Sequence, residues 1–286
     1  MRKRAAIIPT SSIMGDNSNF KQIKQAMFLF DTIGVPECTM IAWVDSQFEE
    51  NYLFRQLEFL IKKQLIFDPM HLLGEVISDS KNLEIFNQYG KELGSALASN
   101  KSQPVFETSA RLFNWVVNNS SLSKEIESIP LISDLTVNSQ IPTQKSEVIN
   151  ILIENIPIPS ELTAWEAILE FKSDPDNQGR LAALRNWVNK TISSNKNPSE
   201  IRDEIDDLLY RYRKSLEIHK ITYHKGIFQT IVVSSLELLE NALKLKLSTI
   251  ATDLFKISQG DIDLMSVELN APGNELAYIY AAQNKF

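Results

Sequence analysis

The chain has 286 residues, of which 43% are hydrophobic and 23% are charged, a composition typical of a globular protein with enough apolar material for one large domain or two ordinary ones. Its 29 basic and 36 acidic residues give a formal net charge of -7, which disfavours broad nucleic-acid binding because phosphate contacts require a basic face. The single cysteine, Cys38, excludes an intrachain disulfide and the usual structural zinc sites, and we expect it to be a small buried side chain.

The sequence predicts neither a secretion signal nor a membrane-spanning segment. The first apolar stretch, residues 5–9, is shorter than a signal peptide requires. Residues 227–239 form the longest apolar region, but polar side chains interrupt it and it falls short of the ~20 residues that cross a bilayer. We therefore expect a cytoplasmic protein with no membrane partner.

The start of the chain predicts alternating strand and helix. Residues 4–9 form a short apolar run that ends in a proline and favours a strand. Residues 20–33 carry apolar side chains three or four positions apart, which indicates a helix, and residues 38–44 favour a second strand. If both strands share a sheet, this order predicts a parallel, right-handed β-α-β unit.

Helices dominate the next part of the chain. Apolar spacing predicts helices over residues 48–65, 76–98 and 109–117. Residues 120–144 are rich in Ser, Asn, Thr and Pro, and we interpret them as a linker or a long surface excursion that separates two domains.

The second half predicts one strand followed by helices. Residues 147–158 are apolar and β-branched, and we expect a buried strand that ends at the following prolines. Asp174 before Pro175 and Asn197 before Pro198 are helix-start signals, since each offers a side-chain cap followed by a proline in the first turn.

Residues 227–255 collect apolar side chains on two helical faces, although their β-branched start favours an extended conformation. Residues 274–286 predict a short closing helix. Together these elements predict a helix-dominated α+β chain, in which an N-terminal β-α-β unit precedes a mainly helical part. We place an α/β domain at 1–119, the linker at 120–144, and a mainly helical domain with one strand at 145–286.

Familiar catalytic fingerprints are missing from the sequence. It has no glycine-rich phosphate-binding loop, no HExxH zinc motif and no G-x-S-x-G nucleophile elbow, so we expect no cofactor and no metal. His219 and His224 are five residues apart, a poor helical spacing for two ligands. Glu170 and Lys172 have the E-x-K form of one nuclease class, but their position after a helix-start signal indicates the end of a short helix.

A candidate ligand site follows the two predicted N-terminal strands. Thr10, Ser11 and Asp16 come after the first strand and Asp45 after the second, and the carboxyl ends of parallel strands are where open α/β sheets bind ligands. Hydroxyl groups and backbone donors in such a loop suit a phosphate. The alternative is that these residues simply form turns, since Ser, Thr and Asp favour them.

A candidate interaction face lies on the helix predicted after Pro198. Ile201, Ile205, Leu208 and Tyr212 form an apolar stripe at helical spacing. Such a stripe, like the two-faced segment at 227–255, suits packing against a protein partner or a second copy of the chain. The alternative is burial of both within one monomer.

Three stretches have a familiar pattern: residues 26–33, residues 57–69 (LEFLIKKQLIFDP) and residues 275–286 (ELAYIYAAQNKF). They resemble uncharacterised bacterial proteins of unknown function, some of them associated with mobile or defence gene cassettes. The resemblance covers about an eighth of the chain, rests on apolar helix patterns, and implies no catalytic residues.

From these patterns we expect an interaction or regulatory component of a bacterial complex, with a defence role as the resemblance implies. Two alternatives remain open. One is an enzyme that acts on a phosphate-containing substrate, such as a metal-dependent nuclease. The other is a nucleic-acid-binding protein that uses Arg2, Lys3 and Arg4 together with a helix at 57–69.

Overall fold

The computed structural model describes residues 2–9, 19–38, 52–99, 102–131, 144–160, 162–218, 221–224, 227–230 and 268–286. Internal packing divides the chain into two compact units. The first unit comprises residues 1–154 and 158–168, and the second comprises residues 155–157 and 169–286.

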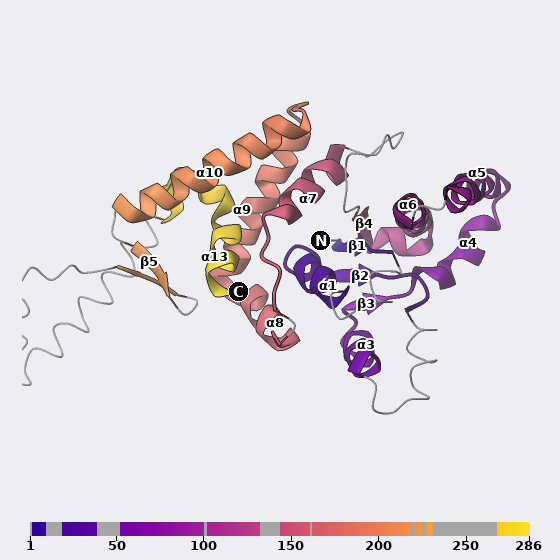
Figure 1. The fold of residues 1–286 in the computed structure, drawn as a ribbon, viewed down its shortest axis with the longest axis horizontal. Helices are drawn as coiled ribbons and strands as arrows, with labels where there is room; N and C mark the ends of the chain where they lie inside the picture. Colours follow the sequence, from indigo (N-terminus) through magenta and orange to yellow (C-terminus); the bar gives the residue numbers. More distant parts are fainter. Residues whose placement is uncertain are drawn as a thin grey trace, which may run out of the picture. The chain divides into compact units, whose positions relative to one another are not determined.

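A parallel sheet of four strands, in the order β3-β2-β1-β4, forms the centre of the first unit (Figure 1). Its strands are β1 (Lys3–Ile7), β2 (Thr32–Gly34), β3 (Ile66–Phe67) and β4 (Ile126–Pro130). In this sheet, Ala5 pairs with Thr32 on one side and with Ser128 on the other. β1 is therefore an inner strand, and its last three residues are fully buried.

Helices surround this sheet: α1 (Asn19–Met27), α3 (Tyr52–Lys62), α4 (Leu73–Ile77), α5 (Ser80–Ala98), α6 (Ser102–Asn119) and α7 (Gln144–Glu154), with short 3-10 turns η2 (Pro69–Leu72) and η3 (Ser121–Lys124). Ala5 and Ile7 of β1 pack into a core with Phe113 and Val116 of α6. Ala6 points to the opposite face because side chains alternate along a strand. Figure 1 shows α1 and α6 on opposite sides of the sheet.

The segment at 158–168 belongs to the first unit because α1 binds it. Lys24 is almost fully buried, and its Nζ donates to the carbonyls of Ser160 (3.3 Å) and Thr163 (2.7 Å). The same ammonium lies 5.2 Å from the centre of the Trp165 ring, and Phe20 meets that ring edge-on at 5.9 Å. Carbonyl oxygens and an aromatic face thus replace the water that a buried lysine loses.

The second unit is helical, with a small hairpin. Its elements are the later part of α8 (Trp165–Ser173), α9 (Pro175–Ile192), α10 (Pro198–Ile218), β5 (Ile221–His224), β6 (Ile227–Thr230), η4 (Asn274–Leu276) and α13 (Ala277–Lys285). Tyr212 and Leu216 of α10 form a core with Ala271 and Ala277. The C-terminal segment, residues 268–286, therefore packs against α10.

Both predicted helix-start signals in this unit are confirmed. Asp174 accepts a hydrogen bond from the backbone amide of Asn177 at 3.0 Å, and α9 begins at the next residue, Pro175. Asn197 accepts from the amide of Glu200 at 3.0 Å, while the Glu200 carboxylate accepts from the amide of Asn197 at 2.8 Å. This reciprocal arrangement satisfies two backbone donors that the first turn of a helix leaves unpaired.

The predicted fold class is confirmed: a helix-dominated chain in which an N-terminal parallel sheet interleaved with helices precedes a helical part. Helix α13 lies within the closing helix that the sequence predicts. None of the helices in the described ranges combines the length and the apolar content that a bilayer crossing needs.

The second strand lies elsewhere than the sequence indicates. β2 is Thr32–Gly34, which overlaps the end of the helix predicted at 20–33, while residues 39–44 lie outside the described residues. Helix α1 ends at Met27. Asp31 then pairs with Arg4, because its carboxylate accepts from the Arg4 amide (2.9 Å) and its own amide donates to the Arg4 carbonyl (2.8 Å). These bonds hold the chain beside β1.

Two further expectations are corrected. Residues 147–158 were expected to form a strand, but helix α7 runs to Glu154, and its residues Val148 to Leu152 are all buried. A helix buried on most sides has a continuous apolar sequence, which periodicity cannot distinguish from a buried strand. Residues 126–130, within the expected linker, form β4. Its Ser128 hydroxyl is satisfied by Asn114 of α6 at 2.9 Å.

We predict that Gly273→Ala destabilises the second unit. Gly273 has a φ of +83°, and an added Cβ would lie 2.1 Å from the carbonyl oxygen of Leu208. The left-handed backbone alone costs a residue with a Cβ about 1–2 kcal/mol, and the clash adds to this. Urea unfolding should show the loss. Gly179→Ala in α9, where an added Cβ meets nothing within 4 Å, is the control and should leave stability unchanged or raised by up to about 1 kcal/mol. Equal effects of the two substitutions would contradict this assignment.

Candidate functional site

The strand order creates one candidate ligand position in the first unit. Along the chain, β2 pairs with one side of β1, and β3 pairs with the far side of β2. The chain then passes through α4, α5 and α6, and β4 pairs with the other side of β1. Open α/β sheets bind ligands outside the carboxyl ends of the strands at such a reversal. The amide of Leu131 donates to the carbonyl of Ile7 at 2.9 Å, so β1 and β4 stay paired up to this edge.

Of the predicted ligand residues, Thr10, Ser11 and Asp16 follow β1 in the sequence. These three and Asp45 all lie outside the described residues. Because β2 ends at Gly34, Asp45 comes eleven residues after the second strand and does not directly follow it.

Asp68 directly follows β3, at the edge where the carboxyl ends of the strands lie. The sequence did not predict it as a site residue. Its side chain is buried, and its Oδ1 accepts from the backbone amides of Glu37 (3.0 Å) and Met70 (2.9 Å). Asp68 therefore fixes the loop after β2 to the turn after β3. This is a positioning role, because the carboxylate is engaged with the backbone.

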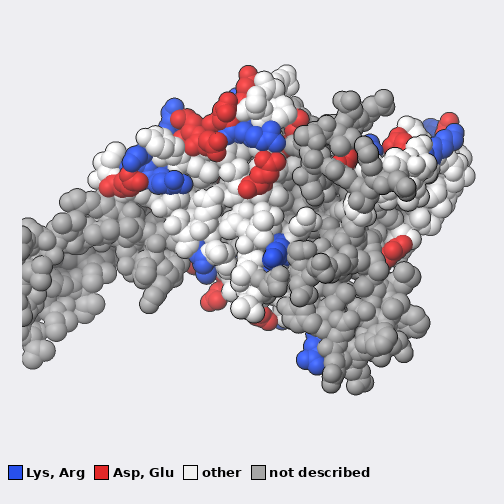
Figure 2. All heavy atoms as spheres, in the orientation of Figure 1, with Lys and Arg blue, Asp and Glu red and all other residues white. Residues whose placement is uncertain are grey.

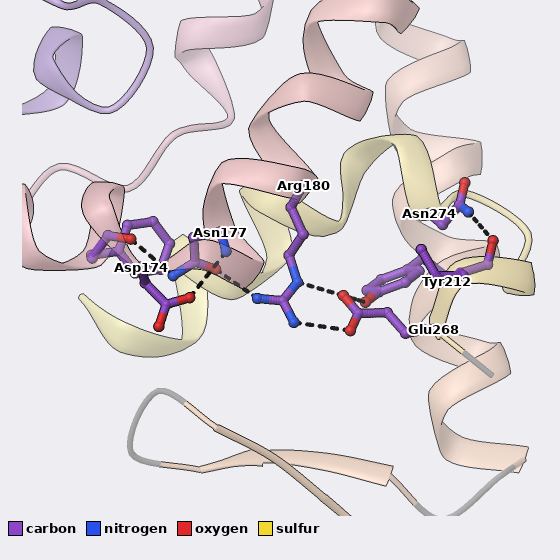
Figure 3. Close-up of polar contacts among 8 residues, drawn as sticks. Asp174, Asn177, Arg180, Tyr212, Glu268 and Asn274 are labelled. Carbon is purple, nitrogen blue, oxygen red and sulfur yellow. Dashed lines mark hydrogen bonds and ion pairs between the residues drawn. The ribbon is translucent and has the colours of Figure 1, made fainter. Parts of the chain in front are cut away.

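A buried polar cluster lies in the second unit (Figure 3). The Nη2 of Arg180 donates to Glu268 Oε2 at 2.9 Å, and its Nε donates to the other carboxylate oxygen. Tyr212 donates to Glu268 Oε1 at 3.3 Å, and the Nη1 of Arg180 donates to Asn177 at 2.7 Å. The side chains of Arg180 and Glu268 are only 11% and 16% exposed. The cluster joins α9, α10 and the C-terminal segment.

The electrostatics of this cluster favour a fixed charge state. Burial raises the pKa of the Tyr212 hydroxyl well above its usual value, and the Glu268 carboxylate raises it further. Burial works against the charge of Arg180, but the hydrogen bond and charge of Glu268 outweigh it and raise the pKa of the guanidinium. Since both carboxylate oxygens are occupied and the tyrosine stays neutral, we assign the cluster to holding the C-terminal segment in place.

The predicted interaction face on α10 is mostly buried inside the second unit. Ile201, Ile205 and Tyr212 are 0% exposed, and Leu208 is half-buried. A partner could reach these three only by displacing what covers them, which at Tyr212 includes Ala271 and Ala277. The outer face of α10 is highly charged, and Figure 2 shows acidic and basic side chains intermingled along it.

In the first unit, α5 and α6 form an outer helical layer. α6 packs on β1 and β4, and α5 packs on α6 (Figure 1). Only Ala96 of the nineteen residues of α5 is buried. Three large apolar side chains of this helix are exposed: Leu83 by 43%, Ile85 by 40% and Leu97 by 59%.

A groove of about 660 Å³ runs along the same two helices, lined by Gln88, Lys91, Glu92, Ser95, Ala96, Ser99, Pro104, Thr108 and Arg111. The Nη2 of Arg111 makes long contacts with Glu92 (3.4 Å) and Thr108 (3.3 Å). Its buried Nε has no hydrogen-bond partner. The charges of Arg111 and Glu92 offset each other, and Lys91 adds one further basic side chain at the groove.

The other residues that the sequence analysis considered for catalysis or metal binding give no sign of a site where the structure describes them. Glu170 and Lys172 lie near the end of helix α8, as predicted, rather than on a strand. Cys38 is buried, also as predicted. The structure describes neither His219 nor the side chain of His224. Within the described ranges, no three His, Cys, Asp or Glu side chains gather in a way that could hold a metal ion.

The residues proposed for nucleic-acid binding lie at β1 and in the segment that leads from α3 to β3. Lys3 and Arg4 are the first residues of β1, and residues 57–69 supply the end of α3 and the strand β3.

Comparisons with known proteins identify no relative, because no protein-family model, curated protein or solved structure matches the chain. Any function is therefore proposed from the chain's own residues.

We predict that Arg180→Met lowers the free energy of unfolding by about 3–5 kcal/mol, because it leaves the Glu268 carboxylate buried without its partner. Adding Glu268→Gln should recover part of this loss, since the buried charge is then removed. Urea unfolding of the two variants measures both effects.

Arg211→Met is the matched control, because Arg211 forms an exposed ion pair with Asp207, with side chains 60% and 49% exposed. It should cost at most about 1 kcal/mol. Similar losses at Arg180 and Arg211 would show that the buried pair does not hold the second unit together.

Proposed function

We propose that the chain is a non-catalytic interaction component of a protein complex, and that it binds its partner through α5. The observation that carries this is the exposed apolar surface of α5. Leu83, Ile85 and Leu97 are three exposed large apolar side chains on one helix, more than any other described element carries. Exposed apolar surface gathered on one element is typical of protein-binding sites.

The width of the apolar stripe on α5 supports the proposal. Successive residues of an α-helix are turned by about 100° around its axis, so Phe86 and Tyr89 lie on the same face of α5. This face points toward the core that α6 helps to form, and both side chains are partly buried there. Leu83 and Leu97 lie on one side of these two core-facing residues, and Ile85 lies on the other. The stripe is therefore wider than α6 covers. Burying a leucine fully gains about 1.5–3 kcal/mol, so a partner that covers the flank gains appreciable free energy.

Other polar and apolar clusters are already committed within the chain. The α10 stripe contributes to the core of the second unit, and the Arg180 cluster has its donors and acceptors engaged. Neither needs a partner. Leu83 and Leu97 of α5, in contrast, share one flank of a single helix and remain exposed.

Site-specific photo-crosslinking in the native host tests the proposal. With a photo-reactive amino acid at position 83, we expect a discrete crosslinked product, because a bound partner covers that flank. The same amino acid at Asp206, on the exposed charged face of α10, is the control and should give no such product. Adding Leu97→Arg should abolish the product at position 83. Equal crosslinking at both positions, or a product that persists with Leu97→Arg, would refute binding through α5.

A second candidate function is binding of a phosphate-containing ligand at the reversal between β1 and β4. The strand order favours it, and the hydroxyl residues Thr10 and Ser11 come shortly after β1 in the sequence. This candidate covers an enzyme as well as a sensor, because the reversal point gives a place for a ligand but no reaction.

Thermal unfolding with inorganic phosphate, ATP or NAD tests this candidate. A ligand at 100 times its Kd should stabilise the chain by about 2.7 kcal/mol and raise its Tm. The Thr10→Ala/Ser11→Ala variant should lose the shift, and Ser194→Ala, at an exposed serine just after α9, should retain it. The absence of a shift with all three compounds would remove the candidate.

A further inference from the structure

We propose that the partner bound by α5 is a second copy of this chain, whose own α5 packs against the first in antiparallel orientation. This inference rests on the proposed function and names its partner. It is carried by the spacing, the shape and the charge of one flank of α5.

The flank carries a seam at heptad spacing. Leu83, Asn87, Gly90, Gly94 and Leu97 follow one another at intervals of four, three, four and three residues, and all five are exposed. A mean spacing of 3.5 residues keeps these positions facing one neighbouring helix along its length, as in a coiled coil. The seam covers about 21 Å of α5 (Ser80–Ala98), at 1.5 Å per residue from Leu83 to Leu97.

The shape of the seam suits an antiparallel pair. A two-fold axis that places Leu83 opposite Gly94 of the second copy also places Gly94 opposite its Leu83, so Leu83 of each copy meets a glycine. Asn87 then lies opposite Gly90, and Leu97 opposite Ser80. A Cβ built at Gly90 or Gly94 would meet nothing within 4 Å, so there is room for the opposing side chain. A parallel pair would instead set leucine against leucine and glycine against glycine.

The charges beside the seam fit the same orientation. Glu84 and Lys91 each follow a seam residue, so they lie on the same side of the helix, and both are exposed. An antiparallel two-fold pair brings this side of the two helices together. Glu84 then lies about two residues, or ~3 Å along the axis, from Lys91 of the second copy, and symmetry repeats the pair. A parallel pair would turn this side toward the flank that packs on α6.

One helix from each copy makes a small interface, so we expect a dimer that dissociates on dilution. Light scattering and sedimentation of the full chain over a range of concentrations should show a monomer that converts to a dimer. Gly94→Lys should weaken the dimer roughly tenfold or more, because it sets a charge against Leu83 of the second copy. It should not unfold the chain, since glycine is the poorer helix former. Gly179→Lys, at an exposed glycine of α9, should leave the dimer unchanged.

Charge reversal and cysteine pairing test the orientation. Glu84→Lys or Lys91→Glu alone should each weaken the dimer roughly twofold to fivefold, and the two together should restore it. A mixture of Leu83→Cys and Gly94→Cys chains should form a disulfide between the two different variants. Cys38 is buried and does not compete. Disulfides between identical variants alone would overturn the antiparallel arrangement.

A strict monomer at every concentration would overturn self-association through α5. If position 83 still crosslinks to a different protein, the proposed function stands and only the identity of the partner is wrong. If position 83 crosslinks to nothing and the chain is a monomer, both proposals fail.

Discussion

Hydrogen bonding of β1 on both edges is the constraint that organises the first unit. Ala5 pairs with β2 and with β4, and the strand is buried on both faces. An inner strand without room for water needs apolar residues on both sides, and small ones where helices approach closely. Ala5, Ala6 and Ile7 meet this need. The positions of α1 and α6, and of the reversal between β1 and β4, all follow from the place of this strand.

A consequence of this layering is that α5 does not pack directly on the sheet. α6 occupies the face of the sheet beside β1 and β4, so α5 packs on a helix rather than on the sheet. Its apolar residues therefore outnumber the places in which they can be buried within one chain. The second unit differs, because the C-terminal segment folds back onto α10 and covers an apolar stripe that the sequence alone leaves exposed.

Local signals were the part of the fold that the sequence predicted well. The caps at Asp174 and Asn197 depend on atoms within three residues, and both formed as expected. The three-residue strand β2 was missed because it is too short for a periodic pattern and depends on the distant partner Arg4. β4 was missed because Ser128 and Pro130 are typical of loops, although a partner on α6 satisfies the serine.

The candidate sites also differ in how far the sequence could predict them. The strand ends could be predicted as a ligand position because topology follows from the order of elements, but the residues named there lie outside the described ranges. The Arg180 cluster could not be found, because Arg180 and Glu268 are 88 residues apart and no local pattern links them. The heptad spacing of the seam on α5 is visible in the sequence. The sequence does not show whether such a seam faces the core or solvent, and only the burial of its residues in the structure distinguishes the two.

The long sequence separation within the Arg180 cluster also bears on how the chain is made. A nascent chain to which Arg180 has just been added carries a guanidinium whose carboxylate does not yet exist. At about 5–20 residues per second, the ribosome needs roughly 4 to 18 seconds to reach Glu268. Until residues 268–286 are made and fold back, Arg180 lacks its carboxylate, and Tyr212 and Leu216 of α10 lack the cover that Ala271 and Ala277 provide.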